Sequence, residues 1–159
     1  HPDLIINSGV AGGTGSGIPL GSVVVGDRVV YHDVFCGAEN RPGQADGCPD
    51  YFYGAEEVVT LPALANERHG LICSGDQFII DRASVDVIRS KHPDVLAVDM
   101  ESASIAHTCY RYNVPFCSIR VVSDTPGEVE DDEKQYYDFW AEAPKSTFRC
   151  LKNILASLK

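Results

Sequence analysis

Acidic residues follow two apolar stretches of this sequence, and they are the side chains best suited to chemistry. The stretch Val95–Met100 leads into Glu101, and the stretch Phe116–Val122 leads to Asp124, 23 positions after Glu101. The segment between them, Ala103–Tyr112, has the pattern of a helix, so together they predict a strand–helix–strand unit. Ligands of open α/β sheets bind at the carboxyl ends of strands. We therefore expect one carboxylate to hold a substrate and the other to act as an acid or base.

Two charged residues near these strand ends each have two interpretations. Arg120 lies inside an apolar strand, where it must be paired or face a polar cavity. It is either half of a structural ion pair, with Asp99 or Asp124 as its partner, or part of a binding site. Glu101 either stabilises the dipole of the helix that follows it or accepts hydrogen bonds from the two vicinal hydroxyls of a sugar.

Glycine-containing segments follow two further predicted strands. The segment Ser8–Gly13 follows the strand Asp3–Asn7 and predicts a tight turn whose backbone could approach a ligand, although it matches neither phosphate-binding glycine motif. The segment Ser74–Ile79 follows the strand Gly70–Cys73. Its Phe78 either stacks on a planar base or belongs to the core, which is the commoner place for a Phe.

The remaining segments alternate between strands and helices, which predicts an α/β fold with a largely parallel central sheet in one domain over residues 1–159. In chain order we expect a loop over Thr14–Leu20, one or two strands over Val23–Tyr31, a long loop over His32–Tyr53, a helix over Glu56–Glu67 interrupted at Pro62, a helix over Arg82–His92 with Val85, Val87 and Ile88 facing inward, and a helix over Gln135–Leu158 with a kink or break near Ala143.

Charge and cysteine content exclude several classes of protein. The chain has 13 basic and 23 acidic residues and a net charge of −10, which argues against nucleic-acid binding. No stretch approaches the roughly 18 consecutive apolar residues of a membrane span. The six cysteines lack metal-ligand spacing, which predicts free thiols, no metal site and a cytoplasmic protein; a disulfide between Cys36 and Cys48 is the alternative.

Five segments of the sequence occur together in one family: Asn7–Gly13, Tyr31–Asp33, Ser74–Ile79, Val98–Ser102 and Arg120–Asp124. In this order they resemble the 5′-methylthioadenosine/S-adenosylhomocysteine nucleosidases of the nucleoside phosphorylase superfamily, over essentially the whole chain. The resemblance implies a three-layer α/β/α domain with a mixed, largely parallel sheet. It also implies a cofactor-free homodimer in methionine salvage that hydrolyses the N-glycosidic bond and releases adenine.

The resemblance also implies residue roles. Asp124 matches the general acid that protonates N7 of the leaving adenine, which requires a raised pKa and hence a desolvated pocket. Ser123 would orient that carboxyl, and Arg120 would help to place the water that attacks ribose C1′. The other matched positions bind substrate: Glu101 at the ribose hydroxyls, Met100 under the sugar, Phe78 and Ile79 at the purine, Val10, Ala11 and Gly12 in the glycine-rich segment, and Tyr136 or Tyr137 as an aromatic lid.

Two features depart from the family. The family's N-terminal third, which holds the Glu that activates the water, has no counterpart in a chain that begins without Met, so we expect an incomplete catalytic unit. Val10 stands where many relatives have Ser. The long segment Phe35–Tyr53 fits the family's loop that reaches the alkylthio pocket of the partner subunit.

Three functions stay open at this stage. The first is hydrolysis of 5′-methylthioadenosine or S-adenosylhomocysteine. The second is a sister activity, either phosphorolysis or hydrolysis of another purine nucleoside such as aminodeoxyfutalosine or adenosine; the lack of an extra basic phosphate cradle argues against phosphorolysis. The third is a non-catalytic relative of the storage-protein type, against which the retention of Glu101, Arg120 and Asp124 argues.

Overall fold

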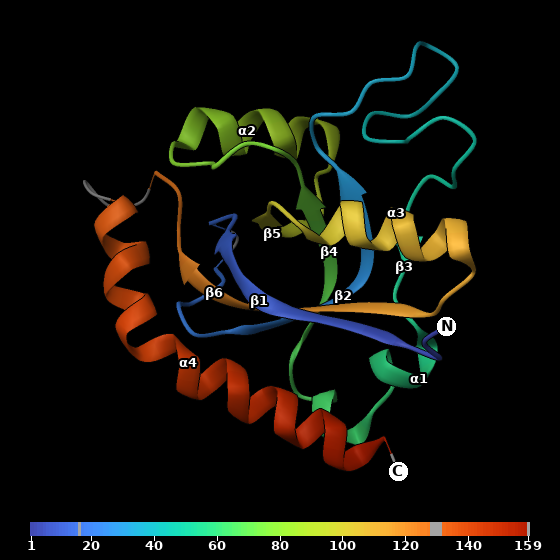
Figure 1. Ribbon diagram of the computed structural model, residues 1–159. Coiled ribbons are helices and arrows are strands. Elements are labelled where there is room, and N and C mark those ends of the chain that lie inside the picture. The colour runs from blue at the N-terminus through green and yellow to red at the C-terminus, as the bar shows by residue number, and fades with distance from the viewer. Residues whose placement is uncertain (16, 128–131, 159) are drawn as a thin grey trace.

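The computed structural model describes residues 1–15, 17–127 and 132–158, without the side chains of residues 132, 133, 135, 136 and 140–148. Its elements alternate between strands and helices along the chain, as Figure 1 shows. In chain order they are β1 (Ile5–Gly13), β2 (Val23–Tyr31), β3 (Phe52–Tyr53), α1 (Glu56–Val59), the 3-10 turn η1 (Pro62–Leu64), β4 (Arg68–Ser74), α2 (Arg82–Lys91), β5 (Val95–Asp99), α3 (Ser102–Tyr112), β6 (Phe116–Asp124) and α4 (Asp132–Ser157).

The strands form one mixed sheet in the order β3-β2-β4-β5-β1-β6, which confirms the expected α/β fold. The pairings β1–β6, β2–β4 and β4–β5 are parallel, whereas β1–β5, β2–β3 and β2–β6 are antiparallel. Because β6 pairs with both β1 and β2, the sheet curves until five of its strands form a closed ring. The sequence pattern contained no sign of this closure.

Helices cover the sheet on both sides (Figure 1). On one side, α2 buries Val85 and Ile88 against β4 and β5, and α3 buries three small side chains against the sheet. On the other, Ile154 of α4 packs with residues of α1 and η1. The prediction that Val87 faces inward is wrong, because this side chain is 56% exposed.

Two predicted interruptions have different outcomes. The chain between α1 and η1 breaks before Pro62, as expected, because Pro cannot continue the hydrogen bonding of a helix. Of the kink or break expected near Ala143, the break is absent, because α4 is one continuous helix over Asp132–Ser157. Figure 1 shows that the helix instead changes direction along its length. The segment Val23–Tyr31 is a single strand whose register shifts between Gly26 and Arg28.

The glycine-rich segment Ser8–Gly13 is not the turn that its composition predicted. It continues β1, which pairs with β6 from Ile5 to Gly12. Ladder hydrogen bonds to β6 on one side and to β5 at the end of the strand hold it extended. The turn prediction failed because glycine lets a backbone turn but does not require it to.

The part of the chain that is described contains six free cysteines, so the alternative disulfide between Cys36 and Cys48 is not formed. No described helix is both long enough and apolar enough to cross a bilayer.

Buried histidine rings give the fold a predictable response to acid. Both ring nitrogens of His92 are buried and have no hydrogen-bond partner in the described structure. Burial lowers the pKa of His92 below its ordinary value of 6.5, so on acidification the unfolded chain takes up a proton that the folded chain resists. The free energy of unfolding is therefore expected to fall as the pH drops below about 6.5.

Replacing the ring tests this assignment. In His92→Phe, the free energy of unfolding measured by urea titration should fall less between about pH 7.5 and pH 5.5 than in the wild type. The matched control is His1→Gln, at an exposed histidine, which should keep the wild-type fall. An equally steep fall in His92→Phe would contradict the assignment.

Candidate active site

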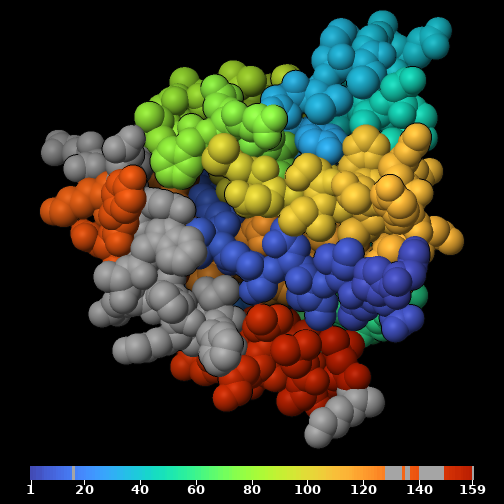
Figure 2. Space-filling view, in the orientation of Figure 1, coloured from blue at the N-terminus to red at the C-terminus, as the bar shows by residue number. Residues whose placement is uncertain are grey.

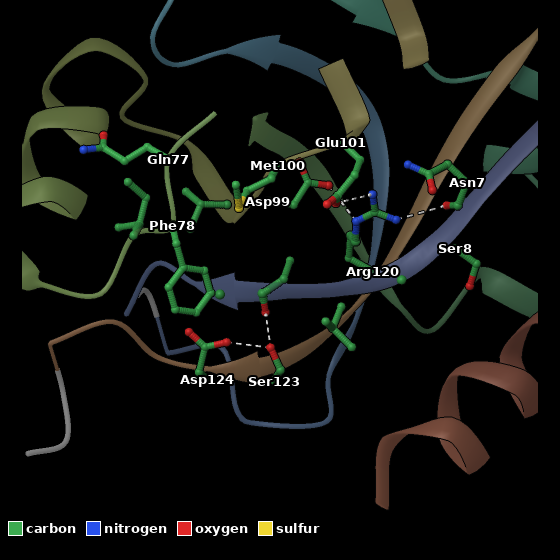
Figure 3. A pocket seen from close by; sticks show the side chains of 16 residues that line it. Asn7, Ser8, Gln77, Phe78, Asp99, Met100, Glu101, Arg120, Ser123 and Asp124 are labelled. Carbon is green, nitrogen blue, oxygen red and sulfur yellow. Dashed lines mark hydrogen bonds and ion pairs between the residues drawn. The ribbon is translucent and has the colours of Figure 1, made fainter. Parts of the chain in front are cut away.

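A cavity of about 320 Å³ opens where β1, β5 and β6 meet. Figure 3 shows its lining side chains, and in the space-filling view of Figure 2 the surface is hollowed where β1 shows between the segments coloured green and yellow. The sixteen lining residues are Asn7, Ser8, Gly9, Val10, Ala11, Gly12, Gln77, Phe78, Ile79, Val98, Asp99, Met100, Glu101, Arg120, Ser123 and Asp124.

The structure therefore places nearly all the expected site residues around one cavity. The exception is Tyr136, which belongs to α4 but whose side chain lies outside the described residues. Six lining residues had received no substrate role from the sequence: Asn7, Ser8, Gly9, Gln77, Val98 and Asp99. Asn7 could have been found from the sequence, because a polar side chain in an otherwise apolar strand indicates a polar contact or a polar cavity.

The two acidic strand ends lie at the same cavity, but their strands are not the neighbours in the sheet that the strand–helix–strand pattern had suggested. β5 and β6 are not neighbours, because β1 lies between them, antiparallel to β5 and parallel to β6. Gly12 of β1 pairs with Val98 on one side and with Asp124 on the other. The ends of β5 and β6 are therefore brought together across β1. Asp124 is the last residue of β6 rather than a residue beyond it.

Glycines of β1 leave room for functional side chains. A Cβ atom on Gly9 would lie 3.1 Å from Nη1 of Arg120, and one on Gly12 would lie 3.1 Å from Oδ2 of Asp124. Real Cβ atoms rarely come this close to a neighbour, so a larger residue would displace either side chain. The glycines serve the site through close approach.

Ser123 and Asp124 form a buried polar pair at one end of the cavity. The hydroxyl of Ser123 donates to Oδ1 of Asp124 at 2.5 Å and lies 3.3 Å from the carbonyl oxygen of Ala11 (Figure 3). Asp124 is 3% exposed and Ser123 is fully buried. A hydrogen bond to one carboxyl oxygen fixes the orientation of the group.

Arg120 has Asp99 as its ion-pair partner, one of the two that the sequence left open. Nε of Arg120 donates to Oδ2 of Asp99 at 2.6 Å, and both side chains are 1% exposed. Nη2 of Arg120 also lies 3.7 Å from Oε2 of Glu101. The arginine is thus both half of a structural pair and part of the cavity wall.

Glu101 precedes α3, but its side chain makes no hydrogen bond that caps the helix. The first backbone N–H of α3, that of Ser102, donates instead to Oδ1 of Asp99 at 3.2 Å. The side chain of Glu101 is 62% exposed and lines the cavity. Its carboxylate is therefore accessible to a ligand, which favours the binding interpretation over the helix-dipole one.

The cavity has two chemically different ends joined by an apolar wall. Figure 3 shows the Phe78 ring beside Asp124, with Glu101 and Arg120 at the far end and Met100 between them. Phe78 and Met100 are 44% and 40% exposed, although both are large apolar side chains. Such a site suits a ligand with a flat ring at one end and several hydroxyls at the other. Among the described residues, no group of three or more His, Cys, Asp or Glu side chains could hold a metal ion.

Comparison with known proteins shows the family to which the chain belongs. The sequence model of the phosphorylase superfamily matches residues 1–156, and the chain belongs to this superfamily. Within it, the chain belongs to the family of 5′-methylthioadenosine/S-adenosylhomocysteine nucleosidases, which are N-glycosyl hydrolases. The family resemblance and the class of enzyme expected from the sequence are thereby confirmed.

Three solved structures illustrate the similarity. S-adenosylhomocysteine nucleosidase from Streptococcus pyogenes, in complex with 5-methylthiotubericidin, is 35% identical with a TM-score of 0.92 over 99% of this chain and 69% of that one. The nucleosidase from S. pneumoniae with a transition-state inhibitor is 34% identical, with a TM-score of 0.90 over 99% and 70%. The enzyme from Colwellia psychrerythraea in complex with adenine is 30% identical, with a TM-score of 0.88 over 99% and 68%.

Removing the buried guanidinium should be far more damaging than removing an exposed one. Arg120→Met leaves the Asp99 carboxylate buried and uncompensated, so we expect a loss of about 3–5 kcal/mol in the free energy of unfolding. The matched control is Arg41→Met, because Arg41 pairs with Asp50 at 3.0 Å with both side chains largely exposed; it should lose no more than about 1 kcal/mol. Urea titration measures both, and similar losses would contradict the assignment.

Proposed function

We propose that this protein hydrolyses the N-glycosidic bond of 5′-methylthioadenosine or S-adenosylhomocysteine and releases adenine. The observation that carries the proposal is the division of the cavity into a buried Ser123–Asp124 pair beside an aromatic ring and an accessible Glu101 beside Arg120. The complexes of relatives with adenine and with nucleoside analogues support the same class of ligand.

Asp124 acts as the general acid at the base end. Adenine leaves poorly as an anion, so a proton must reach N7 while the bond between C1′ and N9 breaks. Its carboxyl group is buried beside the cavity, and the hydrogen bond from Ser123 holds it in one orientation. The bonding electron pair then goes to the purine, which departs as neutral adenine.

Glu101 acts at the sugar end. Its carboxylate accepts hydrogen bonds from the ribose hydroxyls, while Met100 packs under the ring. The breaking bond leaves positive charge on the sugar, as in other glycosidic cleavages, and the negative charge of Glu101 stabilises it. Arg120 helps to place the water that attacks C1′, and the proton that this water loses to solvent balances the one that Asp124 gave to N7. Val10, Ala11 and Gly12 form the backbone wall beside this reaction centre.

The purine lies against Phe78, whose exposed face provides a stacking surface, and the backbone of Ile79 reads the edge of the base. Hydrolysis is favoured over phosphorolysis by the charge of the site. Among the sixteen lining residues Arg120 is the one cation, and its pairing with Asp99 leaves little positive charge for a phosphate.

The first test measures adenine release from 5′-methylthioadenosine by the full-length gene product, with and without inorganic phosphate. We expect release that does not depend on phosphate. A requirement for phosphate would replace the proposal with phosphorolysis. No release from this nucleoside or from S-adenosylhomocysteine would overturn it.

The acid role has its own test. Asp124→Asn cannot donate the carboxyl proton, so kcat should fall by about 10²- to 10⁴-fold while nucleoside binding, measured by calorimetry, persists. The matched control is Asp86→Asn, which changes an exposed carboxylate on α2 and should keep wild-type turnover. Near-normal turnover in Asp124→Asn would show that the acid assignment is wrong.

We also propose that the protein is a cytoplasmic homodimer. The loop between β2 and β3 stands away from the body of the molecule in Figures 1 and 2. Tyr53 on β3 and Tyr110 and Tyr112 on α3 are 67%, 49% and 68% exposed, and a second hollow lies beside Tyr53 and Tyr110. An apolar surface of this kind suits a second copy of the chain. Free cysteines are typical of the reducing cytoplasm.

Sedimentation velocity of the full-length gene product should show a dimer at micromolar concentration. Introducing charge with Tyr110→Glu and Tyr112→Glu together should shift the protein toward the monomer. The matched control, Leu155→Glu, places a charge at an exposed apolar position on α4 and should leave the dimer intact. A wild-type monomer would overturn the proposal.

A further inference from the structure

Asp99 accepts three hydrogen bonds in the cavity wall. Its two oxygens accept from Nε of Arg120 at 2.6 Å, from the backbone N–H of Ser102 at 3.2 Å and from the hydroxyl of Ser102. All three donors are buried. An ionised carboxylate only accepts hydrogen bonds, so its chemistry matches a set of three donors.

These bonds join separate elements of the fold. Asp99 ends β5, Ser102 begins α3 and Arg120 lies in the middle of β6. The Ser102 hydroxyl also lies 2.6 Å from that of Ser118, which is on β6 as well. The backbone carbonyl of Asp99 accepts from the N–H of Gly75, just after β4. One residue therefore fixes the relative positions of two strand ends, a third strand and the start of a helix.

Glu101 gains its position from this arrangement. It lies between Asp99 and Ser102, both of which are held in the buried network, while its own side chain reaches the cavity without capping α3. Arg120 is 3.7 Å from Glu101 but 2.6 Å from Asp99. The nearer carboxylate compensates the guanidinium, so Glu101 is only loosely engaged and its oxygens remain accessible to a ligand.

We propose that Asp99 is a positioning residue for sugar recognition: by holding Arg120 and the start of α3, it keeps the carboxylate of Glu101 available to the ribose hydroxyls. This inference rests on the proposed function, because it concerns the sugar end of the same site. Without the charge of Asp99, the uncompensated guanidinium would attract the one carboxylate left beside it. Glu101 would then bind Arg120 instead of the sugar.

The test compares two substrates, 5′-methylthioadenosine and its 3′-deoxy analogue, which lacks one of the hydroxyls that Glu101 would hold. The quantity of interest is the ratio of their kcat/KM values in the full-length gene product. A residue that only stabilises the fold would lower both values equally. A residue that positions Glu101 would lower the value for the complete sugar more, so the ratio would shrink.

In Asp99→Asn we expect kcat/KM for 5′-methylthioadenosine to fall by about 100-fold, the size of effect typical of a misplaced binding group, and the ratio to shrink at least 10-fold. Asp99→Glu, which restores the charge, should recover part of the ratio. Ser102→Ala removes one donor but keeps the ion pair, and should shrink the ratio by a smaller factor. The matched control is Ser118→Ala, which removes a hydroxyl that does not contact Asp99 and should leave the ratio within 2-fold of the wild type.

The outcomes separate the inference from the proposed function. If the wild type releases adenine and the variants at Asp99 and Ser102 lower both substrates equally, the positioning role is wrong and the proposed function stands. If the wild type releases adenine from neither substrate, both fail. If Asp99→Asn does not fold, by circular dichroism, the ratios in Asp99→Glu and Ser102→Ala decide: unchanged ratios overturn the inference and reduced ratios support it.

Discussion

The guanidinium of Arg120 has to be neutralised where it lies, because a charge removed from water without a partner destabilises a fold by several kcal/mol. This requirement places Asp99 beside it, and Asp99 in turn holds the first N–H of α3. It also requires glycine at position 9, because a Cβ there would crowd the guanidinium. The end of β5, the start of α3 and the middle of β6 are positioned together by this single ion pair.

The two carboxylates suited to chemistry differ because their surroundings differ. Asp124 is almost completely buried and bonded to a hydroxyl, whereas the side chain of Glu101 is mostly exposed beside an arginine that another carboxylate already compensates. The same cavity therefore presents a desolvated carboxyl group at one end and a solvent-accessible one at the other.

Most elements and the position of the candidate site could be predicted from the sequence, but the order of the strands in the sheet could not. The alternation of apolar stretches predicted most elements, and the strand ends at Glu101 and Asp124 indicated the site. The strand–helix–strand pattern suggested neighbouring strands, whereas β1 lies between β5 and β6. Strand pairing depends on contacts between residues that are far apart in the sequence, and local sequence patterns contain no information about such contacts. For the same reason the glycines of β1 suggested a turn, although the pairing with β6 keeps this segment extended. The pairing of β6 with β2 could not be predicted from local patterns either.

The closed ring of strands also bears on how the chain reaches its native state. Ile5 pairs with Phe116, 111 positions later, and Val23 pairs with Val121. The strands β1 and β2 therefore cannot complete their pairing until β6 is present. Closing such long loops is entropically unfavourable until the contacts that reward it exist, and topologies of this kind fold slowly. During synthesis, β1 would leave the ribosome well before its main partner strand. The glycine-rich strand that lines the cavity is thus among the last parts of the sheet that can form.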